Sequence, residues 1–256
     1  MMTRRQLERW SPLLLLAVIL LLWELVVAGF GIPDFIFPSP LQIAAQFKEF
    51  SGPLLEAAWK TFWVTMLGFA LSIVVGVLLG FLIGSSRMAY TALYPLMVGF
   101  NAVPKAAIVP ILVVWFGIGL GPGIITAFLI SFFPITVNIA TGLATLEPEL
   151  EDVLRVLGAR RWDVLVKVGL PRSMPYFFGS LKVAITLAFV GTTVSEMTAS
   201  NEGIGYLLVS AGSAMQMGLA FAGLVVVGAM AMVMYEFFSW VEKRTTGWAH
   251  RGSQAH

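Results

Sequence analysis

The sequence of 256 residues contains no cysteine and only two histidines, His250 and His256. Without cysteine the chain can form neither a disulfide nor a thiolate metal site. The dipeptide Gly-Lys does not occur either, which excludes the phosphate loop of P-loop ATPases. We therefore expect no catalytic residue, no metal site and no cofactor bound by this chain.

Charged residues are also scarce. They make up 12% of the chain, against about 25% in soluble domains. Apolar residues make up 58% and the mean hydropathy is +0.88, values typical of a chain that lies mostly in lipid. Since about 20 residues cross a hydrocarbon core, the sequence predicts one all-α membrane domain over residues 1–256. Its six spans are expected near 11–30, 60–84, 92–117, 123–146, 175–198 and 219–241.

The first apolar segment has a second interpretation, because Arg4 and Arg5 precede it as they would precede a signal peptide. Glu24 lies inside the segment and no small-residue cleavage site follows it, so a spanning helix is favoured. The basic residues then set the orientation. With the N-terminus inside, twelve lysines and arginines lie on the cytoplasmic side and two, Lys48 and Lys60, lie outside. This predicts cytoplasmic N and C termini, with outer segments at 31–59, containing an interfacial helix, and at 199–218, a loop.

A charged segment at 147–172 interrupts the apolar chain and carries ten of its thirty charged residues. Leu150, Val153, Leu154 and Leu157 recur at the spacing of one helix face, and Gly158 follows as a helix-ending glycine would. Trp162 begins a second amphipathic turn. A helical pair outside the membrane must cover its apolar face, and we expect another protein to do so. The alternative is a helix that lies on the lipid surface.

The spacing in this segment resembles the EAA loop of permease subunits of binding-protein-dependent ABC importers. That loop has Glu-Ala-Ala, three residues, Gly, nine residues, a branched apolar residue, any residue and Leu-Pro. Asp152-Val153-Leu154, Gly158 and Val168-Gly169-Leu170-Pro171 follow the same spacing, with Asp for Glu and Val-Leu for Ala-Ala. Further segments resemble the nitrate, sulfonate, taurine and bicarbonate branch of these permeases, and they lie at 31–33, 37–40, 103–110, 115–117, 195–196 and 201–207.

The resemblance implies a type I ABC importer permease with six transmembrane helices in the bacterial cytoplasmic (inner) membrane. It implies a homodimer that binds two ABC ATPase subunits, which hold Mg-ATP, and a periplasmic or lipid-anchored solute-binding protein. The cargo would be a small anion such as nitrate, a sulfonate or taurine, or else a thiamine-precursor, riboflavin or aromatic-acid type of solute. The residues implied to couple to the ATPase are Asp152, Val153, Leu154, Leu157, Gly158, Arg160, Arg161, Trp162, Val168, Leu170 and Pro171.

Polar residues inside the predicted spans are candidates for the cargo pathway. Lys105 follows Pro104 near the middle of the third span, where a charge usually faces a cavity or a partner. Lys105 would attract an anionic cargo, or would instead form a structural ion pair with Glu196 or Glu24. The further pathway candidates are Asn101, Asn138, Thr192, Thr193 and Glu196, although hydroxyls and amides in lipid also join helices to one another.

The second predicted span carries a stripe of small residues, each four positions from the next: Gly68, Ser72, Gly76, Gly80 and Gly84. Such a stripe permits close approach of another helix. It predicts either packing within one bundle or a moving or dimeric interface. Two other classes of protein remain as alternatives to the importer, an ion-gradient secondary transporter and, with less support, a membrane-embedded enzyme.

Overall fold

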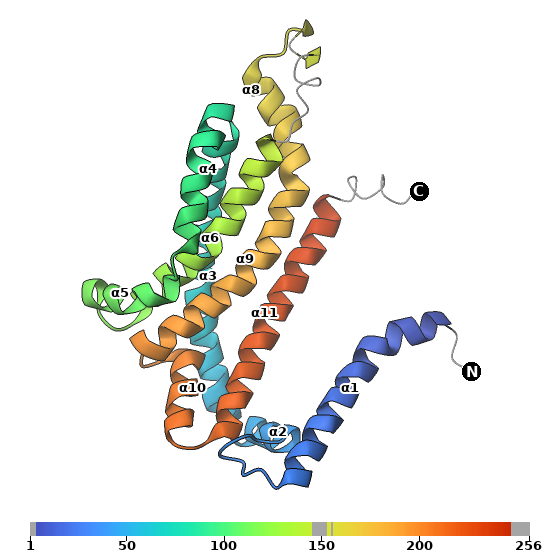
Figure 1. Ribbon diagram of the computed structural model, residues 1–256, viewed down its shortest axis with the longest axis vertical. Helices are drawn as coiled ribbons and strands as arrows, with labels where there is room; N and C mark the ends of the chain where they lie inside the picture. Colours follow the sequence, from blue (N-terminus) through green and yellow to red (C-terminus); the bar gives the residue numbers. More distant parts are fainter. Residues whose placement is uncertain (1–3, 145–152, 155, 247–256) are drawn as a thin grey trace.

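The structure is a computed structural model that describes residues 4–144, 153–154 and 156–246. These residues are nearly all helical and include no strand, and the long helices run roughly along one axis (Figure 1). The elements are α1 Arg4–Phe30, α2 Pro40–Glu49, α3 Ser51–Gly84, α4 Arg87–Ala102, the 3-10 helix η1 Lys105–Ile108, α5 Val109–Phe116, α6 Leu120–Ala144, α8 Arg161–Val164, the π-helix η2 Leu165–Gly169, α9 Leu170–Ala199, α10 Gly203–Ser213 and α11 Met217–Thr245.

Five stretches of helix in the described residues are long and apolar enough to cross a membrane, which confirms the predicted all-α membrane class. They are Trp10–Phe30, Ser51–Gly84, Leu120–Ala144, Val166–Ala199 and Met217–Thr245. A sixth crossing exists if α4 and the η1–α5 pair count as one span, although the two parts are bent by 71°.

The segment predicted as a span near 92–117 is therefore divided between two helical parts instead of forming one straight helix. Val103, between α4 and η1, has extended backbone angles of φ −66° and ψ 128°. Pro104 explains this conformation, because its ring disfavours a helical conformation of the preceding residue and it has no N–H to donate.

The centre of the bundle is formed by α3, α6 and α9. Phe69 of α3, Ile135 of α6 and Phe189 of α9 belong to one buried apolar cluster. The small-residue stripe of α3 packs against α6: a Cβ added at Gly76 would lie 2.9 Å from Ile135, and one added at Gly80 would lie 2.8 Å from Ile139. The stripe is thus occupied by a helix of the same chain.

A second cluster fills the end of the molecule at which α2 and α10 lie, called here the α10 end (Figure 1). It includes Ile43 of α2, Leu54 of α3, Ile204 of α10 and Leu219 of α11. The predicted loop at 199–218 is therefore wrong in part, because most of it forms α10. The opposite end of the bundle carries α8 and is called the α8 end.

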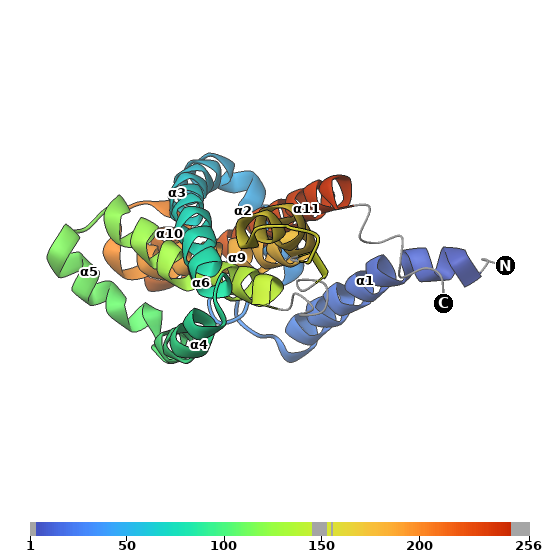
Figure 2. The same ribbon diagram turned by 90° about the horizontal axis from the view of Figure 1, so that it is seen from above.

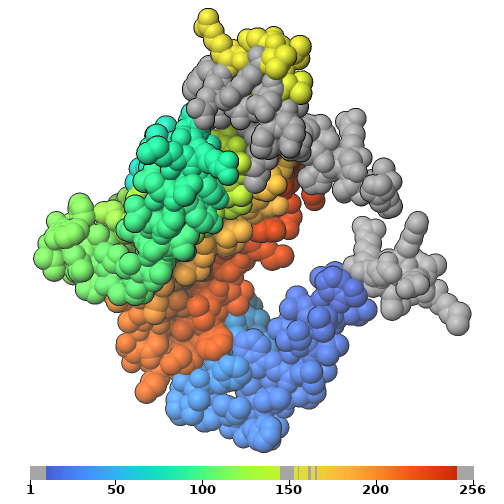
Figure 3. Space-filling model, turned by 45° about the horizontal axis from the view of Figure 1, so that its top comes forward, coloured from blue at the N-terminus to red at the C-terminus, as the bar shows by residue number. Residues whose placement is uncertain are grey.

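Helix α1 stands apart from this bundle. It joins the α10 end and then projects sideways, as Figures 2 and 3 show. Its attachment includes an aromatic group in which Trp23 lies 5.2 Å from Phe37 and 6.0 Å from Phe221, between ring centroids. Only 6% of the apolar window of α1 is buried, so most of its surface is available to lipid or to another polypeptide.

Candidate functional site

The charged segment at the α8 end turns sharply at Gly158. This residue has φ +88°, which confirms the left-handed backbone that the sequence predicts there. The amide of Ala159 donates to the carbonyl of Leu154 at 3.0 Å, which is the six-to-one bond of a Schellman helix end. A Cβ at Gly158 would meet nothing within 4 Å, so the backbone angle, and not crowding, is what requires glycine.

Apolar side chains next to this turn are open to the surroundings. Val153 is 57% exposed, Val156 88% and Leu157 78%. A hollow of about 300 Å³ lies beside them and is lined by Leu154, Leu157, Gly158, Ala159, Asp163, Val164, Lys167 and Val168. An uncovered apolar group of this kind indicates a binding surface.

The remaining residues predicted for coupling lie close to this surface or outside the described part of the chain. Arg160, Leu170 and Pro171 are exposed and Val168 is half-buried. Asp152 lies outside the described residues, and for Arg161 and Trp162 only the backbone is described.

Beyond the turn the chain is helical without a break, because α8, η2 and α9 follow one another from 161 to 199. Pro171 accounts for the wider π-turn just before it, since its ring crowds the carbonyl four residues earlier, at Lys167, in a regular α-helix. Lys167 also pairs with Asp163 at 2.9 Å and holds the pKa of that carboxyl below its ordinary value. Displacement of α8 would thus act directly on a spanning helix.

Lys105 lies at the bend between α4 and η1 and is 9% exposed. Its Nζ donates to the backbone oxygen of Asn101 at 2.5 Å and to the Oδ1 of the same residue at 2.6 Å. In a continuous helix the backbone amide of residue 105 would bond to that carbonyl, and after the bend the ammonium group takes its place. Lys105 therefore caps the carboxyl end of α4.

The expected ion pairs of Lys105 are not present. Glu196 accepts hydrogen bonds from Thr61 and Gly205, whereas Glu24 accepts one from the amide of Leu41 at 3.1 Å. Among the described residues, no carboxylate forms a salt bridge with Lys105.

Glu196 is the centre of a buried polar group that joins three helices at the α10 end. Its Oε2 accepts the hydroxyl of Thr61 in α3 at 2.8 Å and the amide of Gly205 in α10 at 2.9 Å. The Thr61 hydroxyl in turn accepts the amide of Ile204 at 2.8 Å. Glu196 is 4% exposed and Thr61 is fully buried. We call these four residues the Glu196 clamp.

Two glycines allow α10 to approach this carboxylate. Gly203 has φ +90°, and a Cβ there would lie 2.3 Å from Cδ of Glu196. A Cβ at Gly205 would lie 2.2 Å from the carbonyl oxygen of Thr193. The Gly-Ile-Gly sequence is thus required by the close contact between α10 and α9.

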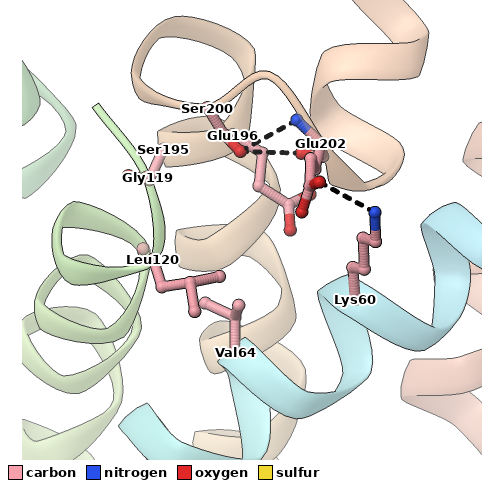
Figure 4. Close-up of a pocket in the computed structure, with 9 residues that line it drawn as sticks. Lys60, Val64, Gly119, Leu120, Ser195, Glu196, Ser200 and Glu202 are labelled. Atoms are coloured by element: carbon pink, nitrogen blue, oxygen red, sulfur yellow. Dashed lines mark hydrogen bonds and ion pairs between the residues drawn. The ribbon is translucent and has the colours of Figure 1, made fainter.

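A cavity of about 10 Å³, room for about one water, lies beside the clamp and is lined by residues that include Ser195, Glu196 and Glu202. In Figure 4, Lys60 reaches from α3 towards Glu202, to which it pairs at 2.9 Å. The two side chains of this pair are 34% and 55% exposed, so it lies at the surface of the site.

The other candidates for the pathway mostly bond within the bundle. Thr192 accepts a hydrogen bond from Thr65 of α3 at 2.9 Å, and Thr193 donates to the carbonyl of Phe189. Asn138 donates to the carbonyl of Pro134 in its own helix at 2.8 Å. Asn101, Pro104 and Lys105 lie together at the α4 bend, while Thr192, Thr193 and Glu196 follow one another along α9.

Sequence reasoning missed a second joint between spanning helices. Lys182 of α9 pairs with Glu242 of α11 at 2.6 Å, and the two side chains are 19% and 12% exposed. The Nζ of Lys182 also lies 5.9 Å from the ring centroid of Tyr235. A lysine inside a predicted span was a signal that a partner must exist, but the identity of Glu242 was not evident from spacing.

Comparison with known proteins places the bundle in a known group. Residues 72–247 match the family described as binding-protein-dependent transport system inner membrane component. A probable ABC transporter permease of Haemophilus influenzae is 33% identical over 91% of this chain and 96% of its own length. The formylaminopyrimidine transport permease ThiX of Halalkalibacterium halodurans is 32% identical over 79% of this chain and 81% of its own.

The putative aliphatic sulfonates transport permease SsuC of Bacillus subtilis is 29% identical over 92% of this chain and 86% of its own. Among solved structures, a chain of the inward-facing methionine ABC transporter MetNI has a TM-score of 0.66 at 18% identity. That match covers 76% of this chain and 96% of the other, and it shows a shared fold.

Proposed function

Since the chain belongs to the family of binding-protein-dependent transport system inner membrane components and is a permease subunit of an ABC importer, we propose that the turn at Gly158 seats on a separate ATPase. The observation that carries this proposal is the exposed apolar group at that turn, in which Val156 is 88% and Leu157 78% exposed. A groove on the ATPase would remove these side chains from water. The polar residues around them would fix the register of the contact.

The continuous helix from 161 to 199 supports the coupling role of this surface. Closure of two ATPase subunits would move the turn, and α9 would follow as a rigid rod. In this arrangement the α8 end and both termini lie in the cytoplasm, and the α10 end faces the solute-binding protein outside a bacterial inner membrane. ATP and Mg²⁺ are bound by the ATPase.

Co-purification of the chain with its ATPase in detergent tests the coupling surface. Leu157→Ser and Val156→Ser are expected to reduce the amount of bound ATPase, because each removes apolar area from the contact. Met88→Ser is the matched control, since Met88 is 84% exposed near the same end and lies outside the turn. Equal ATPase binding in all three variants would contradict the proposed surface.

The assembly is proposed to be a homodimer of this chain with two ATPase subunits. The large exposed apolar surfaces of α1 and α5 support a second copy, for example at Val114 and Trp115, which are 83% and 70% exposed. Native mass spectrometry of the reconstituted complex is expected to show two permease copies. A monomer that transports would contradict this assembly.

The cargo is proposed to be a small anion such as nitrate, a sulfonate or taurine, or else a thiamine-precursor, riboflavin or aromatic-acid type of solute. The names of the relatives, which mention formylaminopyrimidine and aliphatic sulfonates, support this range. Thermal shifts of the solute-binding protein that co-purifies with the complex, measured with nitrate, taurine, an alkanesulfonate, a formylaminopyrimidine and riboflavin, would select among them. A binding protein stabilised only by solutes outside these classes would contradict the range.

A further inference from the structure

We propose that Glu196 is a positioning residue that makes α10 move with α9, so that a contact made on α10 is transmitted to the coupling turn at the opposite end. This inference rests on the proposed function, in which the turn binds the ATPase. It assigns a role in transmission to a buried residue outside the coupling turn.

The first observation is the length and continuity of α9. The helix extends for 30 residues from the π-turn to Ala199, which is about 45 Å at 1.5 Å per residue. Figure 1 shows it running from α8 to the region of α10. A rod of this kind carries displacement between its ends, provided that the elements at each end are fixed to it.

The second observation is the way in which α10 is fixed. The amides of Ile204 and Gly205 belong to the first turn of α10, where helix amides have no partner within the helix. Gly205 donates to Glu196 directly, and Ile204 donates to Thr61, whose hydroxyl donates to the same carboxylate. If α10 moved away from α9, Gly205 would lose its acceptor and Glu196 one of its two donors; if it also left α3, the Ile204 amide would lose Thr61, and each unmade bond is costly.

The third observation is that the other polar link at this position is weak. The pair between Lys60 and Glu202 is largely exposed, and exposed pairs contribute little to stability. The buried Glu196 clamp therefore contributes more to holding α10 in place than this exposed pair does.

The fourth observation identifies a place at which a partner could act on α10. A hollow of about 290 Å³ lies between α3 and α10 and is lined by Glu56, Lys60, Glu202 and Tyr206 among others. Tyr206 and Val209 are 43% and 40% exposed on α10. A protein that docks at this end would press on the element that the clamp joins to α9.

The chain contains no cysteine, so an introduced thiol is the only one in this subunit, and its labelling is read on the isolated permease band. Ser210, exposed on α10, is replaced by cysteine in the permease–ATPase complex in nanodiscs. The rate at which a hydrophilic maleimide modifies this thiol is measured without nucleotide and after trapping with Mg-ATP and orthovanadate. A coupling free energy of ordinary size predicts a rate ratio of about fivefold or more.

Three variants then separate the clamp from general stability. Glu196→Leu removes the acceptor, and the rate ratio is expected to fall to about one. Glu196→Gln keeps a carbonyl oxygen that accepts both bonds. Its rate ratio is therefore expected to stay within about twofold of the ratio measured with Ser210→Cys alone. Glu202→Gln, which breaks only the exposed pair, is the matched control and keeps the full ratio.

Each outcome decides between the two proposals. A wild-type ratio in a folded Glu196→Leu complex overturns the role of Glu196 and leaves the proposed function intact. A rate ratio of one in the complex that carries Ser210→Cys alone, with its ATPase bound, also overturns the role of Glu196 and leaves the proposed function intact. Failure of the unmodified chain to bind an ATPase overturns the proposed function and this inference together. If Glu196→Leu does not assemble, Thr61→Val takes its place and is expected to reduce the ratio.

Discussion

Removal of Lys182 offers the sharpest test of the packing between α9 and α11. Its Nζ lies 2.6 Å from Oε2 of Glu242, and the two side chains are 19% and 12% exposed. At this distance and an effective dielectric constant of about 20, the gross attraction is about 6 kcal/mol. Desolvation of both groups offsets several kcal/mol of it, and loss of one partner from such a pair costs about 3–5 kcal/mol.

We therefore expect Lys182→Met to lower the free energy of unfolding by about 3–5 kcal/mol, because it leaves the Glu242 carboxylate buried without its cation. The double variant Lys182→Met/Glu242→Met replaces both charges by apolar groups, and it should recover most of the loss. Tyr235→Leu, which removes the cation–π contact but leaves the ion pair, should cost about 0.5–1 kcal/mol.

The measurement is reversible unfolding in mixed micelles of dodecylmaltoside and sodium dodecyl sulfate, followed by helical ellipticity. A double-mutant cycle isolates the interaction between the two residues. If the losses of the single variants simply add in the double variant, the pair does not hold α11 to α9 and the reasoning is refuted.

Three further predictions follow from the geometry. Lys105→Met should lower the free energy of unfolding by about 1–3 kcal/mol, since it leaves the Asn101 carbonyl without a donor, whereas Lys105→Arg should retain most of the stability. Thermal melting in detergent measures both variants, and equal losses would contradict the capping role of Lys105. Gly205→Ala should destabilise the protein in the same melting assay, because its Cβ would lie 2.2 Å from the Thr193 carbonyl oxygen. Gly228→Ala is the control: a Cβ there meets nothing within 4 Å, so this change should be neutral or stabilising by up to about 1 kcal/mol. Gly158→Val should cost about 1–2 kcal/mol at the left-handed position and reduce co-purification of the ATPase, whereas Gly158→Asn should be tolerated better. Wild-type ATPase binding by the valine variant would contradict a role for this backbone conformation in coupling.

The fold class could be predicted from the sequence because its signals are local. Long apolar runs and a four-residue stripe of small residues are properties of single helices, and the stripe in α3 proved to be the surface that meets α6. The left-handed angle of Gly158 was likewise predicted from the end of one amphipathic pattern.

Pro104 alone does not predict the bend at Val103, because a proline inside an apolar span can also be accommodated by a mild kink. Hydropathy measures how apolar a segment is and contains no information about its direction, so 92–117 read as one span. The same limit applies to Lys105. The sequence suggests Glu196 or Glu24 as its partner, but the bend frees the carbonyl of Asn101 one turn away, and the Lys105 ammonium group binds there.

The Glu196 clamp could not be predicted, since it depends on contacts between distant parts of the chain. Thr61 and Glu196 are separated by 135 positions, and in the sequence nothing distinguishes Thr61 from Thr65, the other threonine of α3. The close approach of α10 at Gly203 and Gly205 likewise emerges only from the fold, which places Glu196 and the Thr193 carbonyl against these two glycines.

The capping of α2 and α10 has a consequence for selectivity. The amide ends of these helices are natural traps for anions, and both are occupied by carboxylates of the chain itself, at Leu41 by Glu24 and at Gly205 by Glu196. A negatively charged solute at this end therefore finds both amides already occupied and cannot be held by them.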